Sequence, residues 1–79
     1  MFINKTKDGK NNICGTVVVE KRKQLRLSQR ALADRLQLIG LDVDKNAIQR
    51  IECGKRFVTD IELKALSKVL DISLDDLLN

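Results

Sequence analysis

The sequence predicts an all-α domain of five helices, and three observations support this prediction. The 79 residues include no Pro, Trp or Tyr and only two Phe, so Leu, Ile, Val and Ala have to form the core. Apolar residues recur at the three- and four-residue spacing of a buried helical stripe. Residues whose side chains favour a helix N-terminus precede four of these stripes. They are Ser28, Asp44, Thr59 and Ser73.

The first predicted helix runs from Thr16 to Leu25 and follows a polar, basic segment. Residues 1–13 contain a turn-like Asp-Gly pair and lack a helical apolar period, so we interpret them as a flexible N-terminal arm. Three successive valines, at positions 17–19, begin the apolar side of the helix. A chain of this length holds one modest core, so residues 14–79 are predicted to form a single domain.

The second predicted helix begins near Gln29, because Ser28 can accept a hydrogen bond from a free backbone N–H group at the helix start. Gly40 can adopt the left-handed conformation that ends a helix, so we expect this helix to continue through Leu38 or Ile39. Its buried stripe consists of Leu32, Ala33 and Leu36.

Cap residues and a glycine predict the boundaries of the last three helices. The third spans Lys45 to Glu52, and Gly54 closes it. Thr59 with Glu62 three residues later is a capping-box pattern at the start of the fourth, and Ser73 repeats the pattern before a short fifth helix. The stripes of the third and fourth helices are formed by Ile48 and Ile51, and by Leu63, Leu66, Ser67 and Leu70.

Charge is distributed unevenly along the chain, whose net charge is +4. Residues 1–56 carry 13 Lys or Arg against 6 Asp or Glu, whereas residues 57–79 carry 2 against 5. A basic body with an acidic end favours a surface that binds a polyanion and a separate surface for another contact. A solvated surface of mixed charge remains the alternative on charge alone.

The sequence lacks the residues that several classes of function require. The chain has no His, no Gly-rich phosphate loop and no serine elbow, so we expect neither an enzyme nor a cofactor. Cys14 and Cys53 lack metal-ligand spacing and are interpreted as free thiols, with no metal. No apolar run approaches the ~20 residues of a membrane span and no secretory signal is present, so we expect a cytoplasmic protein without membrane contact. No small-molecule ligand is evident.

The second and third predicted helices together carry a specific pattern of residues. It consists of Ser28-Gln29, Leu32-Ala33, Leu36, Val43-Asp44, Ile48 and Arg50-Ile51-Glu52-Cys53-Gly54-Lys55. This pattern resembles the helix-turn-helix of phage-repressor and Cro-type (XRE) transcriptional regulators, and the resemblance covers about residues 16–79. It implies a lambda-repressor-like DNA-binding domain of five helices and a small regulator, of the repressor type, that binds double-stranded DNA.

One segment departs from that family pattern. Residues 37–42 occupy a place where the family commonly has a single glycine. We expect an extra turn on the second helix and a longer loop, with Leu38, Ile39 or Leu41 folded onto the edge of the core.

The resemblance also implies roles for individual residues. The third helix enters the major groove, and the candidates for contacting bases are Lys45, Asn46, Ala47, Gln49 and Arg50. Arg or Lys can donate to guanine, and Asn can pair with adenine. Gln29 at a helix N-terminus, with Lys55 and Arg56 in the following loop, would bind backbone phosphates. The alternative for Gln29 is a plain helix-start residue, and the alternative for the other candidates is an ordinary solvated surface.

Two further relationships are implied by the family. Arg22 and Glu52 match a pair that joins the first helix to the third, although they could instead be independent surface charges. A homodimer on a palindromic operator is expected, because one short helix contacts too few bases for useful specificity. Leu74, Leu77 and Leu78 of the last helix are the candidates for the dimer contact, unless all three face the core. A protein-interaction module or an antitoxin-like partner-binding protein on the same fold is the alternative function.

Overall fold

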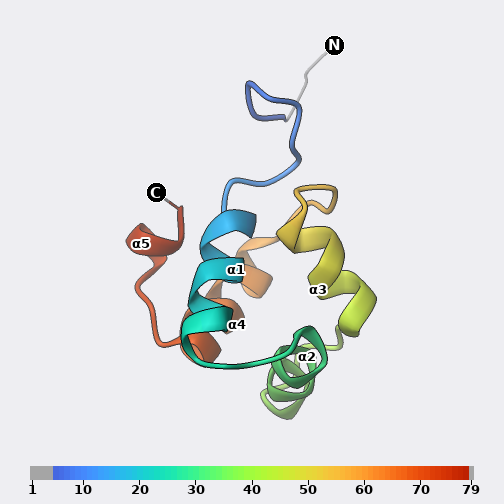
Figure 1. The fold of residues 1–79 in the computed structure, drawn as a ribbon, viewed down its shortest axis with the longest axis vertical. Helices are drawn as coiled ribbons and strands as arrows, with labels where there is room; N and C mark the ends of the chain where they lie inside the picture. The colour runs from blue at the N-terminus through green and yellow to red at the C-terminus, as the bar shows by residue number, and fades with distance from the viewer. Residues whose placement is uncertain (1–4, 79) are drawn as a thin grey trace.

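A computed structural model describes residues 5–78, and within them the chain forms five helices and no strand (Figure 1). The helices are α1 (Gly15–Gln24), α2 (Gln29–Leu38), α3 (Lys45–Glu52), α4 (Asp60–Leu70) and α5 (Leu74–Leu78). The predicted all-α architecture is confirmed. The first four residues of the predicted arm and the last residue of the predicted domain lie outside the described residues. No helix in residues 5–78 is long and apolar enough to cross a membrane.

The helix starts follow the predicted side-chain caps. The N–H of Ala31 donates to Ser28 Oγ over 3.0 Å at the start of α2, and the N–H of Ala47 donates to Asp44 Oδ1 over 2.8 Å at the start of α3. Thr59 and Glu62 form a reciprocal capping box at the start of α4. Each bond satisfies a backbone donor that has no partner within its own helix. These local bonds explain why the starts of α2, α3 and α4 could be located from the sequence.

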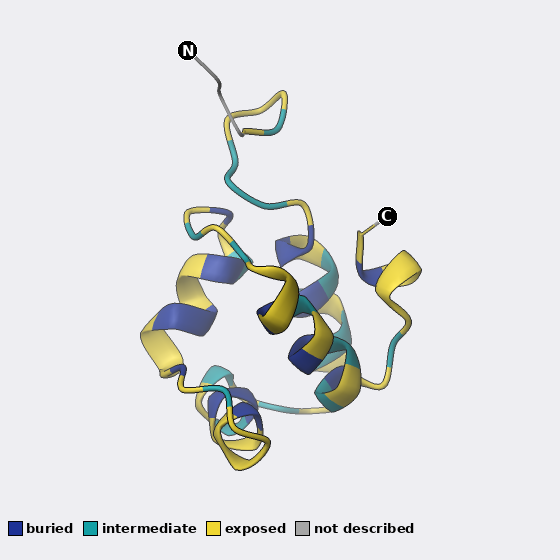
Figure 2. Ribbon diagram, turned by 180° about the vertical axis from the view of Figure 1, so that it is seen from behind, coloured by how far each residue is buried: buried dark blue, intermediate teal, exposed yellow. Residues whose placement is uncertain are grey.

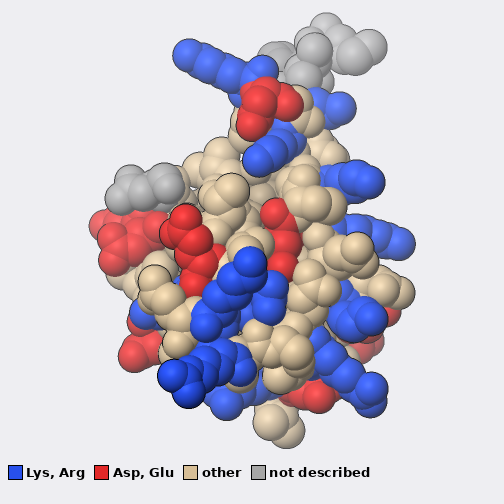
Figure 3. All heavy atoms as spheres, viewed as in Figure 1, with Lys and Arg blue, Asp and Glu red and all other residues tan. Residues whose placement is uncertain are grey.

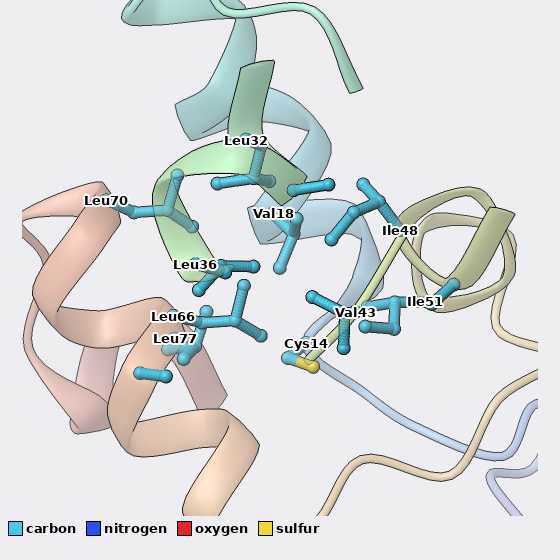
Figure 4. Close-up of a cluster of buried hydrophobic side chains, with 13 residues drawn as sticks. Cys14, Val18, Leu32, Leu36, Val43, Ile48, Ile51, Leu66, Leu70 and Leu77 are labelled. Atoms are coloured by element: carbon cyan, nitrogen blue, oxygen red, sulfur yellow. The ribbon is translucent and has the colours of Figure 1, made fainter. Parts of the chain in front are cut away.

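The core lies where α1, α2, α3 and α4 meet, and α5 closes it against α1 and α4 (Figures 2 and 4). The largest fully buried side chains are Cys14, Val18, Leu32, Leu36, Ile48, Ile51, Leu66, Leu70 and Leu77. Each Val, Leu or Ile removed from water in this way contributes about 1.5–3 kcal/mol to folding. Packing of these side chains therefore sets the angles between the helices of the described chain.

The segment between α2 and α3 forms a loop that packs on the core through one residue. Gly40 adopts a φ of +95°, and the amide of Gln37 donates to the carbonyl of Val43 over 2.7 Å. Leu41 packs against the core, whereas the side chains of Leu38 and Ile39 are 85% and 50% exposed. The extended segment thus contacts the core edge through Leu41 alone among the three predicted residues, because α2 ends at Leu38 and the chain then turns back.

In α5 the three leucines differ in their surroundings. Leu77 is fully buried, whereas Leu74 and Leu78 are 45% and 40% exposed. The prediction that Leu77 belongs to a dimer contact is therefore corrected. Its side chain fills the core between α1 and α4, because α5 packs against both of these helices. Ser73 caps the start of α5, where its Oγ accepts from the N–H of Asp76 over 3.1 Å.

Candidate nucleic-acid interface

Arg22 of α1 and Glu52 at the end of α3 form a bidentate ion pair. Arg22 Nε lies 2.6 Å from Glu52 Oε2 and Nη2 lies 3.1 Å from Oε1, and the two side chains are only 12% and 7% exposed. Arg22 Nη1 also donates to the carbonyl of Leu27, in the connection to α2, over 2.8 Å. Because both side chains are largely buried, loss of either partner would leave the other charge buried and unpaired. The pair joins three segments around the end of α3.

Gln29, the first residue of α2, joins the same cluster. Its side-chain amide donates to Glu52 Oε1 over 2.9 Å, so one carboxylate holds both Arg22 and Gln29. The first N–H groups of a helix have no partner within it and favour an anion nearby. The carboxylate therefore fixes the position of the α2 N-terminus relative to α3. Because the side-chain amide of Gln29 already donates to Glu52, it is only partly available to bind a phosphate.

The exposed face of α3 carries four of the five residues predicted to contact bases. Lys45, Asn46, Gln49 and Arg50 are exposed. Ala47 is buried, with 8% of its surface exposed, because it lies on the same face of α3 as Ile48 and Ile51. The inclusion of Ala47 among the base-contacting residues is therefore corrected, since its methyl group packs in the core.

The two predicted phosphate contacts after α3 have different surroundings. Lys55 is exposed, whereas Arg56 Nη2 forms a 2.5 Å ion pair with Glu62 Oε2. Burial alone would raise the pKa of Glu62, but hydrogen bonds from the Thr59 N–H and from Arg56 outweigh it and hold this pKa below its ordinary value. Arg56 therefore ties the loop after α3 to the start of α4. No spacing rule would have indicated this pair.

Lys and Arg side chains gather along the edge of the molecule formed by α3 and continue toward α2 and the N-terminal segment (Figure 3). Asp and Glu gather around α5, on the opposite edge of the same view. Further Lys and Arg side chains lie in the middle and lower left of the view, over α1 and the connection after it. The α3 edge is therefore basic and the α5 edge acidic, with additional basic side chains between them. Such a basic edge raises the local concentration of a polyanion.

A family model described as helix-turn-helix matches residues 18–77. The chain belongs to the helix-turn-helix family. The match runs from α1 to α5, and it therefore includes the α2–α3 pair, the ion pair of Arg22 with Glu52, and the longer connection between the two helices. The predicted phage-repressor and Cro-type family is confirmed.

Two solved structures share this fold. The restriction-modification controller protein C.AhdI from Aeromonas hydrophila is 28% identical, with a TM-score of 0.70, over 81% of this chain and 86% of that protein. The P22 c2 repressor, solved in complex with a synthetic operator, is 31% identical, with a TM-score of 0.73, over 86% of this chain and 96% of the repressor. A comparison with curated proteins found no match. The predicted lambda-repressor-like fold of five helices is confirmed.

Proposed function

We propose that this helix-turn-helix protein is a small transcriptional regulator that binds double-stranded DNA sequence-specifically and represses transcription. The observation that carries this proposal is the exposed polar row of α3, beside a basic loop and on a helix held by buried contacts. Family membership and the similarity to a repressor solved with its operator support the same function. The function is binding and not catalysis, and the DNA it binds lies in the cytoplasm.

In this proposal α3 lies in the major groove, and three of its four exposed candidate side chains have a chemical partner. Arg50 and Lys45 donate to guanine O6 and N7, and Asn46 pairs with N6 and N7 of adenine. Lys55 binds a backbone phosphate, as does the N-terminus of α2 at Gln29. The contacts of Glu52 with Gln29 and Arg22 keep the phosphate-binding and base-contacting parts in one arrangement.

Selection of preferred duplexes from a random library, followed by fluorescence anisotropy at several salt concentrations, tests the proposal. We expect the selected duplex to bind more tightly than a scrambled one, and both affinities to fall as salt rises. Absence of binding to every duplex at low salt would contradict DNA binding and favour the protein-interaction function on this fold.

We also propose that the protein binds a palindromic operator as a homodimer through α5. Leu74 and Leu78 remain exposed after the core is complete, and Asp75 and Asp76 between them are exposed and would form a polar rim. Two copies of α3 about one helical turn of DNA apart would double the number of bases contacted. Analytical ultracentrifugation on the selected duplex should show two chains per duplex, and one chain when Leu74 and Leu78 are both changed to Ser. A single wild-type chain per palindrome would contradict the dimer.

A further inference from the structure

Asn12, which the sequence placed in a flexible arm, connects the start of α1 to the end of α3. Its Oδ1 accepts from the N–H of Gly15 over 2.9 Å. Its Nδ2 donates to the carbonyls of Ile51 and Arg56, over 3.2 and 2.7 Å. One carboxamide thus uses its acceptor at α1 and its donor at α3 and the following loop.

The neighbouring residue attaches to the same loop. The N–H of Asn11 donates to the carbonyl of Gly54 over 2.7 Å, and Asn11 Nδ2 donates to the carbonyl of Lys55 over 2.8 Å. Gly54 has a φ of +80°, and a Cβ added there would lie 2.7 Å from Cγ of Lys10. The stem of Lys10 therefore covers the backbone of the loop that carries Lys55.

The residues before this attachment form a closed turn. The N–H of Thr6 donates to the carbonyl of Lys10 over 2.7 Å, and the N–H of Gly9 donates to the carbonyl of Thr6 over 2.9 Å. Gly9 supplies the φ of +83° that the turn requires. Lys5 and Lys7 are exposed on this turn, whereas Lys10 Nζ lies 3.7 Å from Asp8 Oδ2. Two lysines without an ion-pair partner in the described chain thus extend from the turn.

We propose that Lys5 and Lys7 form, together with Lys55, one phosphate-binding surface that Asn11 and Asn12 hold in place. This inference rests on the proposed DNA-binding function and adds to it a second phosphate-binding segment outside the helix-turn-helix. In Figure 1 the turn lies beyond the C-terminal end of α3, beside the loop after it. The turn therefore extends the basic edge of α3 beyond the end of that helix.

Attachment of the turn changes how much Lys5 and Lys7 contribute to the free energy of DNA binding. A free arm loses conformational entropy when it is ordered on DNA, whereas a turn already fixed beside Lys55 has lost most of it during folding. Asn11 and Asn12 are therefore positioning residues in this proposal. They act through the lysines and need not contact DNA themselves.

The first test removes the two charges. The slope of log affinity against log salt should become less steep by about 0.9 for each lost phosphate contact. We therefore expect the change in slope to be close to twice that value for a variant with Lys5→Gln and Lys7→Gln. A variant with Lys64→Gln and Lys68→Gln is the matched control, because it loses the same charge from exposed positions on α4. Equal slopes for both double variants would overturn the proposal.

The second test releases the turn and leaves its charges unchanged. Asn12→Ser retains a hydroxyl oxygen that suits a helix start but removes the carboxamide donor to the carbonyls of Ile51 in α3 and of Arg56 in the following loop. We expect it to lower the slope as the lysine variant does, and to have no further effect when combined with that variant. Asn11→Ala is a second variant with less effect on folding, because its backbone bond to Gly54 remains. Thermal melting must show that each variant is folded at the temperature of the binding assay.

The outcomes separate this inference from the proposed function. Salt-dependent binding by the wild type with an unchanged slope in the lysine variant would overturn the inference and leave DNA binding intact. A lysine effect that persists in full in the Asn12→Ser and Asn11→Ala backgrounds would show a free basic arm and overturn the positioning role. Absence of binding by the wild type would contradict both.

Discussion

Gly15 of α1 lies against the carbonyl oxygen of Ile51 in α3, so that a Cβ added at Gly15 would stand 2.3 Å from this oxygen. That distance is far inside van der Waals contact and the obstacle is backbone, which cannot rotate away. The close approach lets Asn12 reach both helices and places the end of α3 beside the start of α1.

Gly15→Ala should therefore destabilise the protein, although Gly to Ala inside an ordinary helix stabilises it by up to about 1 kcal/mol. We expect a loss of about 1–3 kcal/mol, because α1 has to shift away from α3. Urea unfolding measures the change, with Thr16→Ala at the adjacent exposed position as the control. An alanine variant as stable as the wild type would show that α1 and α3 are not in close contact.

Glu52→Ala should cost about 3–5 kcal/mol of unfolding free energy, because the Arg22 guanidinium would stay buried without its partner. Gln29 would lose its bond to the same carboxylate, so binding to all duplexes should weaken as well. Asp34→Ala, which removes an exposed carboxylate from α2, is the control and should change stability little. Unchanged thermal melting in Glu52→Ala would mean that Arg22 and Glu52 do not depend on each other in solution.

Arg50→Ala and Asn46→Ala should each cost about 1–3 kcal/mol on the selected duplex and relax the preference at one base position. Lys55→Ala should weaken binding to selected and scrambled duplexes alike and lower the salt slope by about one. Anisotropy on both duplexes across a salt series measures the two effects together. If Arg50→Ala lost affinity equally for every duplex, α3 would not contact bases, and the longer connection before it would have displaced it from the groove.

The ionised Glu62 should make stability depend on pH in the acidic range. Its pKa is lower in the folded chain than in the unfolded chain, so its stabilisation is fully present above the ordinary glutamate pKa of about 4.3. The stabilisation is lost as the pH falls through the lower, folded pKa. Glu62→Gln should be less stable than the wild type at neutral pH, with a difference that narrows in acid. Urea unfolding at neutral and acidic pH tests this, and a constant difference would contradict a lowered pKa of Glu62 in the folded chain.

Local chemistry explains what could be predicted from the sequence. Each of Ser28, Asp44 and Thr59 bonds to a backbone N–H three residues later, so the starts of α2, α3 and α4 depend on near neighbours alone. The bounds of α3 agree with the prediction for this reason. The family pattern in α2 and α3 similarly allowed the fold and the exposed row on α3 to be predicted.

Packing between helices decided which side chains are buried and which distant residues come into contact. The orientation of α3 buries Ala47. The packing of α5 against α1 and α4 buries Leu77 and leaves Leu74 exposed. A short helix with leucines on several sides could bury any one of them, so the sequence alone did not decide this. The contacts of Asn12 with Ile51 and Arg56 span 39 and 44 residues of sequence. The sequence by itself determined where the helices begin and which family they belong to, because caps and stripes depend on residues a few positions apart. Only the tertiary structure decided which side chains the helices bury and which distant residues they bring together, because those choices depend on how the packed helices fill a shared core.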